Sequence, residues 1–179
     1  MARLGFRHCD HRHPFLWQSD QQPAARWHGA DDGPANYFAD TPVGAWAEFL
    51  RHEEITDEAD LAGVRRSLWV VELPDTGYAT PRLSARVMTG GPVSYAACQA
   101  EARRLRRAGA RRLEAPGAAL KPGAARGWVA SPGVMPAGTS RDGRVWVLFG
   151  PCDALGWPAV VAGSPPAAVL PLVRHLRHF

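Results

Sequence analysis

The chain has 179 residues, which is long enough to bury one sizeable core and too short for two full domains. We therefore predict a single domain over residues 1–179, with a C-terminal tail at about 165–179. The formal charge of +4 and the isoelectric point near 9.4 favour anionic ligands without identifying one. No apolar run reaches membrane-spanning length, and the N-terminal segment lacks the apolar core of a signal peptide. We expect a cytoplasmic protein that makes no membrane contact.

The cysteines and the N-terminal histidines argue against disulfides and metal. Cys9, Cys98 and Cys152 are odd in number and scattered, which is typical of reduced thiols in a cytoplasm. Residues 7–13, RHCDHRH, are rich in potential metal ligands. Structural zinc sites need a second ligand pair elsewhere in the chain, and none follows. We favour hydrogen-bonding histidines there and expect no metal site.

A helix is predicted to begin at Thr41 and Pro42. The threonine oxygen can accept a hydrogen bond from a free backbone amide, and proline has no amide to lose at the first helical position. The apolar residues that follow are spaced as one buried helical stripe: Val43, Trp46, Ala47 and Leu50. Glu48 lies off this stripe, where a carboxylate stays ionised while its neighbours hold it in place.

Two further residues precede this helix at regular spacing. Arg26, Tyr37 and Glu48 are separated by equal steps of eleven residues. Residues 35–39, ANYFA, read as a short strand in which Tyr37 and Phe38 face opposite sides. Arg26 precedes a polar GADDGP segment, so we expect it near the mouth of a surface loop.

The remaining pattern completes one α+β domain with a mixed or antiparallel sheet core and packed helices. Residues 67–73, SLWVVEL, predict a central strand, and residues 74–92 a turn-rich connection. A helix is expected from a cap at Ser94 to a stop at Gly109. Further strands are predicted at 111–115, 144–149 and 157–161, and a short or broken helix after Ser164.

Arginines form the strongest basic cluster near the end of the second helix: Arg103, Arg104, Arg106, Arg107, Arg111 and Arg112. Nucleic-acid binding is the more specific interpretation, but the cluster lacks interleaved aromatic residues and a binding motif. A docking surface for an acidic partner is a second interpretation. We favour a solvated helix face, because cations suit a helix C-terminus, and we expect no direct nucleic-acid binding.

The segment around Arg26 and Glu48 resembles the RES domain family, the toxin half of a group of bacterial toxin–antitoxin pairs. The usual family text is G-x-RW-N-x-x-G, then Y-x-(A/S)-(D/E), then A-x-x-E. Arg26 with Trp27 matches the first motif, residues 37–40 the second and residues 45–48 the third. His28 stands where an asparagine is common.

Other parts of the chain extend the resemblance. Arg7 matches the opening arginine of the family, and the helix around residues 98–110 with the following APxAAL matches its later half. The similarity covers about residues 6–120 and continues weakly into VWVLF. The family pattern carries a serine in APSAAL, whereas this chain has Gly117 there.

The resemblance implies a fold related to ADP-ribosyltransferases and cleavage of NAD at the nicotinamide glycosidic bond, with phosphate as acceptor in some members. NAD would be the substrate, with no resident cofactor, and a helical antitoxin the partner. By residue, Arg7 and Arg26 would bind the pyrophosphate or ribose, Tyr37 would stack on nicotinamide, and Glu48 would stabilise the ribosyl cation. These roles agree with the chemistry of guanidinium, aromatic and carboxylate groups.

Two alternatives to NAD cleavage with phosphate remain open at this stage. The chain would transfer ADP-ribose onto a protein or nucleic acid if the acceptor were a macromolecule. It would be a catalytically inactive binding protein if Gly117 in place of the serine abolishes activity.

Overall fold

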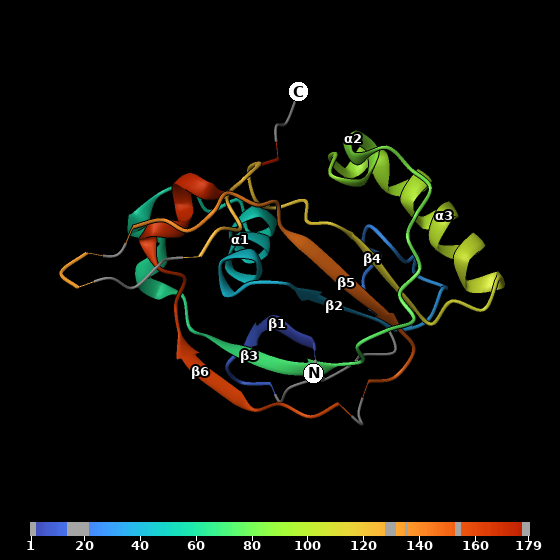
Figure 1. Ribbon diagram of the computed structural model, residues 1–179, viewed down its shortest axis with the longest axis horizontal. Helices are drawn as coiled ribbons and strands as arrows, with labels where there is room; N and C mark the ends of the chain where they lie inside the picture. Colours follow the sequence, from blue (N-terminus) through green and yellow to red (C-terminus); the bar gives the residue numbers. More distant parts are fainter. Residues whose placement is uncertain (1–2, 14–21, 128–131, 135, 153–154, 177–179) are drawn as a thin grey trace.

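A six-stranded antiparallel sheet forms the centre of the molecule (Figure 1). The computed structural model describes residues 3–13, 22–127, 132–134, 136–152 and 155–176. The strands in spatial order are β4 (Arg112–Pro116), β5 (Arg144–Phe149), β2 (Ala35–Ala39), β1 (Arg3–Asp10), β3 (Arg66–Leu73) and β6 (Ala159–Gly163). The helices are α1 (Pro42–His52), α2 (Ala85–Met88) and α3 (Tyr95–Arg107), with 3-10 turns η1 (Glu58–Gly63), η2 (Pro92–Ser94) and η3 (Ala167–Leu172). The prediction of one α+β domain is confirmed.

Strand alternation divides the sheet into two faces with different neighbours. Ala35 and Tyr37 of β2 pack in the cluster that contains the buried side of α3, together with Val147 of β5. Phe38 packs on the opposite face with Trp146. Tyr37 and Phe38 therefore face opposite sides, as the period of two predicts, and Tyr37 lies on the helix-covered face.

Helix α1 begins and packs as its sequence predicts. The Thr41 hydroxyl oxygen accepts a hydrogen bond from the Gly44 amide at 2.9 Å, so it caps the helix. The apolar stripe packs in a cluster with η1, η3 and the segment after β4, through residues that include Trp46, Leu50 and Leu120. Figure 1 shows η3 beside α1, on the side away from α2 and α3. This packing fixes the rotation of α1 and therefore the direction of Glu48.

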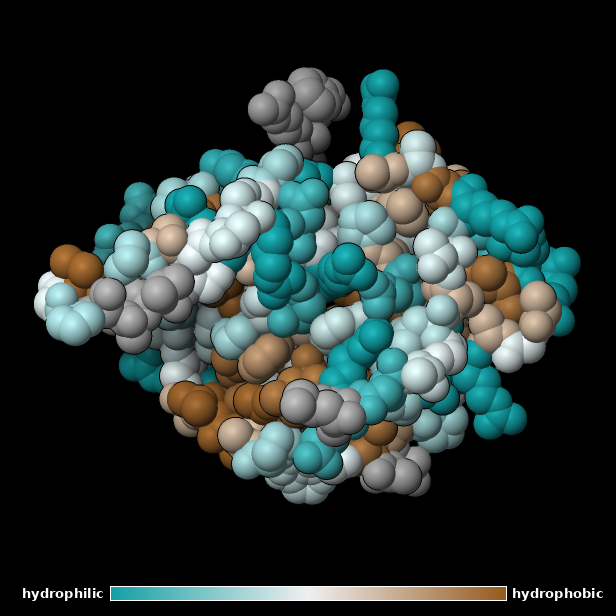
Figure 2. Space-filling model, in the orientation of Figure 1, coloured by the Kyte–Doolittle hydropathy of each residue, from teal (hydrophilic) through white to brown (hydrophobic). Residues whose placement is uncertain are grey.

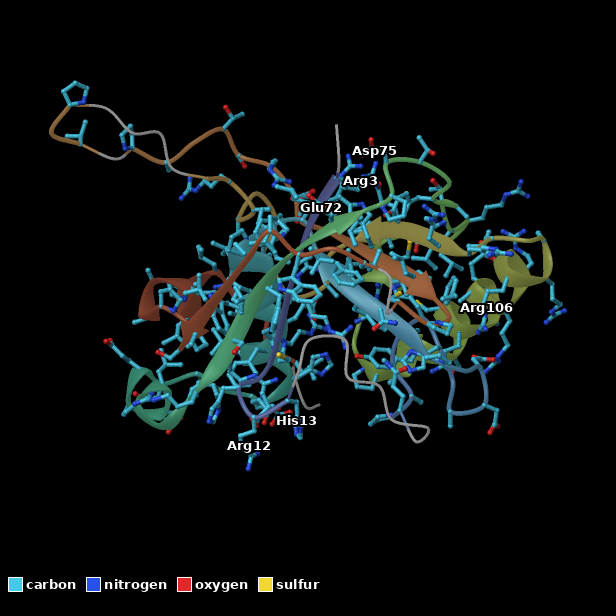
Figure 3. The ribbon with its side chains drawn as sticks, turned by 90° about the horizontal axis from the view of Figure 1, so that it is seen from below. Arg3, Arg12, His13, Glu72, Asp75 and Arg106 are labelled. Atoms are coloured by element: carbon cyan, nitrogen blue, oxygen red, sulfur yellow. The ribbon has the colours of Figure 1, made fainter. Side chains whose placement is uncertain are left out.

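Strand β1 was not predicted, because its arginine, histidine and aspartate content hides the strand pattern. It lies inside the sheet and pairs with β3 along its whole length, from Arg3 opposite Leu73 to Asp10 opposite Arg66. Figure 3 shows its two ends on opposite sides of the molecule, with Arg3 near Glu72. On its other side β1 pairs with β2 only at Phe6 and Ala39. The two strands hold together at one point, which leaves room between them.

Several predicted boundaries were wrong in detail. Strand β3 lies between β1 and β6, one position from the sheet edge and not at its centre. The 74–92 connection contains the short helix α2, and β6 begins two residues later than predicted. Ser94 occupies the predicted N-cap position of α3, but its side chain makes no capping hydrogen bond, because its hydroxyl donates to the Gly91 carbonyl at 2.8 Å. The last predicted helix is the 3-10 turn η3, which contains Pro171.

Apolar surface gathers over the edge strand β6. Val160, Val161 and Trp157 are exposed there, and Figure 2 shows a brown area at the lower left, where Figure 1 places this strand. Within the described residues, none of the helices has the length and apolar character needed to cross a bilayer. Phe15 and Trp17, which the sequence marks as apolar, lie outside the described residues.

Candidate functional site

A cavity of about 270 Å³ lies on the helix-covered side of the sheet. Its lining comes from β1, β2, α1, the first turn of α3 and the segment that precedes β2, with Pro116 of β4, Ala118 after it and Val145 of β5. All four predicted site residues, Arg7, Arg26, Tyr37 and Glu48, contribute to its wall. Binding sites for small molecules measure roughly 300–1,000 Å³, so this cavity suits a ligand of modest size or one part of a larger ligand.

Tyr37 is held in the cavity wall by its hydroxyl group. The hydroxyl oxygen accepts a hydrogen bond from the Trp27 amide at 2.9 Å, and His28 Nδ1 lies 2.9 Å from the same oxygen. Burial raises the pKa of Tyr37, so the phenol stays neutral. The two contacts lock the ring in one orientation, which is the property that a stacking surface needs.

Arg26, which precedes the predicted surface loop, is itself buried beside Tyr95. Its guanidinium lies over the Tyr95 ring, 4.6 Å from the centroid. Nη2 donates to the Gly90 carbonyl at 2.7 Å and Nη1 donates to Ser94 Oγ at 3.2 Å. These contacts tie the segment before β2 to the start of α3 and place a fixed positive charge in the cavity wall.

Arg51 is a second buried cation at this site, and the sequence analysis missed it. Its side chain reaches the Gly90 carbonyl at 3.2 Å, the same oxygen that accepts from Arg26. It also donates to the carbonyls of Ala118 and Arg174, the latter at 3.0 Å. Only 3% of Arg51 is exposed, and burial lowers the pKa of its guanidinium.

The helical spacing contained a signal for Arg51. It lies four residues after Ala47 and eight after Val43, so the buried stripe of α1 continues through it. An arginine at a stripe position is buried with its charge, and a buried charge needs partners.

Glu48 supplies the negative charge of the cavity. It lies at the edge of the buried stripe of α1, and 30% of its side chain is exposed. Its Oε2 lies 3.9 Å from His52 Nε2, one turn further along the helix. Because Arg26 and Arg51 both line the cavity with Glu48, the two guanidiniums outnumber the carboxylate. The wall formed by these residues carries a net positive charge.

Arg7 lines a different part of the cavity. Its Nη1 donates to Asn36 Oδ1, and its guanidinium lies 5.9 Å from the Phe38 ring centroid. Both partners belong to the face of β2 opposite to Tyr37. Arg7 therefore bridges β1 and β2 where their pairing has ended, and its guanidinium contacts Asn36 and Phe38 rather than Gly90, which Arg26 and Arg51 share. Burial lowers the pKa of Arg7.

The histidine-rich segment after Arg7 has a structural role. His8 stacks on Trp46 and meets Phe49 edge-on, with centroid distances of 6.4 and 5.3 Å. Arg66 Nη2 lies 3.0 Å from His8 Nδ1. Burial, together with Arg66, lowers the pKa of His8 to about 3, so the ring is neutral. Among the residues with described positions, no three side chains of the ligand types His, Cys, Asp and Glu gather as a metal site would require.

Close contact with Gly143 explains why a glycine stands at position 117. A Cβ atom added there would lie 3.2 Å from the Gly143 carbonyl carbon and 3.3 Å from its oxygen, while the Gly117 amide donates to that oxygen at 2.8 Å. The chain therefore passes too close to Gly143 for any side chain to fit without movement. Whether the missing hydroxyl affects activity stays an open prediction.

Two other charged features of the chain lie away from the cavity. Glu54 is exposed after α1 with a φ of 55° and is not part of the cavity wall. The arginine cluster is largely engaged: Arg103 pairs with Asp32 at 2.9 Å, and Arg104 with Glu101 at 2.7 Å. Arg106, which lies over Phe149, is labelled on α3 in Figure 3.

One family model matches most of the chain and identifies its protein family. The family model described as RES domain matches residues 3–147, which include every residue of the cavity wall discussed above. The chain belongs to the RES domain family. A search of curated proteins gave no match.

The RES fold is also seen in a solved structure from M. tuberculosis, the crystal structure of the MbcT–MbcA toxin–antitoxin complex. The similarity has a TM-score of 0.61 over 96% of this chain and 89% of that one, with 15% sequence identity. At this identity the comparison establishes the fold alone. The RES match and the shared fold agree with the α+β architecture described above.

The cavity of this RES domain suits a ligand with two kinds of group. Paired guanidiniums bind phosphate oxygens. A carboxylate in a partly enclosed cavity stabilises positive charge that develops nearby, since the surrounding protein screens less than water does. Tyr37 and Tyr95 add aromatic surface to the same wall. The arrangement therefore favours a substrate that is anionic at one end and becomes cationic where a bond breaks.

Proposed function

We propose that this RES domain cleaves NAD at the bond between nicotinamide and ribose. The observation that carries the proposal is the shared wall of Arg26, Arg51, Tyr37 and Glu48 in one cavity. When the glycosidic bond breaks, positive charge spreads over the ribose ring, and a carboxylate fixed beside it lowers the barrier. Glu48 supplies that carboxylate.

Each remaining group has a place in this reaction. Arg26 and Arg51 bind the pyrophosphate. Their two positive charges balance its negative charge. The locked ring of Tyr37 stacks on the flat, cationic nicotinamide. Arg7 contacts the ribose or phosphate side from the opening between β1 and β2. The cavity volume suits the nicotinamide riboside half of NAD, with the rest of the dinucleotide at the mouth.

Phosphate is the acceptor in this proposal, which gives nicotinamide and an ADP-ribose phosphate as products. The purified protein should consume NAD faster when phosphate is added, with release of free nicotinamide. With radiolabelled NAD, the label should stay in small molecules. Label on protein or nucleic acid would instead identify a transferase, and an untouched NAD pool at high enzyme concentration would refute both activities.

Glu48→Gln is the decisive variant, because it keeps the shape of the side chain and removes its charge. We expect kcat to fall by about 10²–10³, the range for loss of one electrostatic stabiliser in an active site. Glu53→Gln is the matched control, since it makes the same change at the exposed end of α1, outside the cavity. Equal activity of wild type and Glu48→Gln would remove Glu48 from the mechanism.

The biological role in this proposal is that of a toxin that depletes cytoplasmic NAD. The RES family assignment supports it, as does the fold shared with a toxin from a toxin–antitoxin complex. A helical antitoxin that covers the cavity would be the partner. Co-expression with the product of the adjacent open reading frame should restore growth and NAD levels, whereas Glu48→Gln should need no such protection.

A further inference from the structure

Behind Glu48 lies a second, much smaller cavity. Its volume is about 10 Å³, and Glu48 belongs to its wall as well as to that of the large cavity. The other residues that bound it include Asp40, Gly117 and Gly143. Glu48 therefore borders both the proposed substrate site and this small cavity.

Asp40 has an unpaired oxygen beside this space. One carboxylate oxygen, Oδ2, accepts a hydrogen bond from Arg141 Nη1. The other, Oδ1, is buried and has no hydrogen-bond partner in the described part of the chain, although only 5% of the side chain is exposed. Buried polar atoms are nearly always hydrogen-bonded, to protein or to an ordered water. The free oxygen therefore points to a ligand.

Gly143 leaves open the place where that ligand fits. A Cβ atom added to Gly143 would lie 3.8 Å from Asp40 Oδ1 and 3.3 Å from Leu120 Cδ1. A side chain there would enter the space that Asp40 and Glu48 both border. A cavity of roughly 10–15 Å³ holds one water molecule when at least two polar groups are available to it. The size and the two carboxylates meet both conditions.

We propose that one water molecule occupies this space and donates one hydrogen bond to Asp40 Oδ1 and the other to the Glu48 carboxylate. Asp40 is then a positioning residue for Glu48. The His52 ring, 3.9 Å away and exposed, is too distant to hold the carboxylate by a hydrogen bond. The water therefore supplies the hydrogen bond that holds the Glu48 carboxylate in place. The positioning role rests on the proposed function, whereas the water site does not.

A high-resolution crystal structure of the full chain tests the water site without reference to activity. The wild type should show a water about 2.5–3.0 Å from both Asp40 Oδ1 and a Glu48 oxygen. In Gly143→Ala the added methyl group should displace it, and its contact with the flexible end of Leu120 is the only close one. Absence of this water from the wild type, or its retention in Gly143→Ala, would overturn the site.

Kinetics of three variants test the positioning role. Asp40→Ala should lower kcat about tenfold with little change in KM, because Glu48 stays present but is held less firmly. Asp40→Asn, whose amide oxygen can still accept from the water, should keep most of the activity. Arg141→Gln removes the ion pair on the other oxygen and leaves Oδ1 in place, so kcat should stay within roughly twofold of wild type.

The pattern of the variants separates positioning from a purely structural role. An equal loss in Asp40→Ala and Arg141→Gln would show that the ion pair matters, which would overturn the proposal. Full activity of Asp40→Ala would also overturn the proposal. If Asp40→Ala does not fold, Gly143→Ala carries the kinetic test, and it should lower kcat in the same way. If the wild type leaves NAD intact, the proposed function is refuted. The crystal structure then still tests the water site independently.

Discussion

Replacing His8 with glutamine should reduce the loss of stability that the protein suffers in mild acid. In the folded chain the His8 ring is enclosed by Trp46 and Phe49, and Arg66 Nη2 lies 3.0 Å from Nδ1. Burial and the nearby guanidinium of Arg66 lower the pKa of His8 from 6.5 to about 3. In the unfolded chain the ring returns to its ordinary pKa near 6.5. Below pH 6.5, His8 is therefore protonated in the unfolded state but stays neutral in the folded state until the pH approaches 3.

The magnitude follows from this difference. The stability contributed by the neutral ring is present above pH 6.5 and is lost as the pH falls, by about 1.4 kcal/mol per unit once the unfolded histidine is protonated. Between pH 7 and pH 5 the wild type should lose about 2 kcal/mol through His8. This figure is an upper limit, because the ring borders the cavity and water screens part of the shift.

Urea unfolding at pH 7, 6 and 5 measures the effect. Glutamine at position 8 can still accept from Arg66 but does not titrate, so the free energy of unfolding of the variant should fall less over this range. The other histidines are the same in wild type and variant, so the comparison isolates the contribution of position 8. Parallel pH profiles for wild type and variant would refute the assignment of a neutral, buried His8.

Three further substitutions test the packing. Leu50→Ala removes a side chain with no exposed surface from the α1 cluster and should cost about 2–5 kcal/mol of unfolding free energy, whereas exposed Leu4→Ala should cost little. Thr41→Ala removes the cap of α1 and should lower stability by about 1 kcal/mol in the same urea assay. Gly117→Ser should destabilise by about 1–3 kcal/mol, because its Cβ meets the Gly143 backbone. An unchanged free energy of unfolding in Gly117→Ser would show that the segment before β5, which contains Gly143, shifts to accommodate the side chain.

Sequence reasoning succeeded where local rules act alone. The boundaries of β2, the start of α1 and the whole of β5 follow from turn residues, a capping threonine and apolar alternation within a few positions. It failed for β1, whose arginines and histidines find their partners on other strands and on α1, far away in the chain. A strand whose polar side chains are satisfied by tertiary contacts carries no apolar alternation to recognise.

For this protein the amino-acid sequence by itself determined the secondary elements with strong periodicity, the family resemblance, and the choice of Arg26, Tyr37 and Glu48 as candidate residues. Only the tertiary structure decided that these three share a cavity wall, that Arg51 joins them, and that Arg7 lines another part of the same cavity beside Asn36. The physical reason is that helix and strand periods fix which side of an element a residue occupies. They do not fix which elements meet. That depends on long-range packing, here on the pairing of β1 with β2 at a single point and on the shared contact of Arg26 and Arg51 with Gly90.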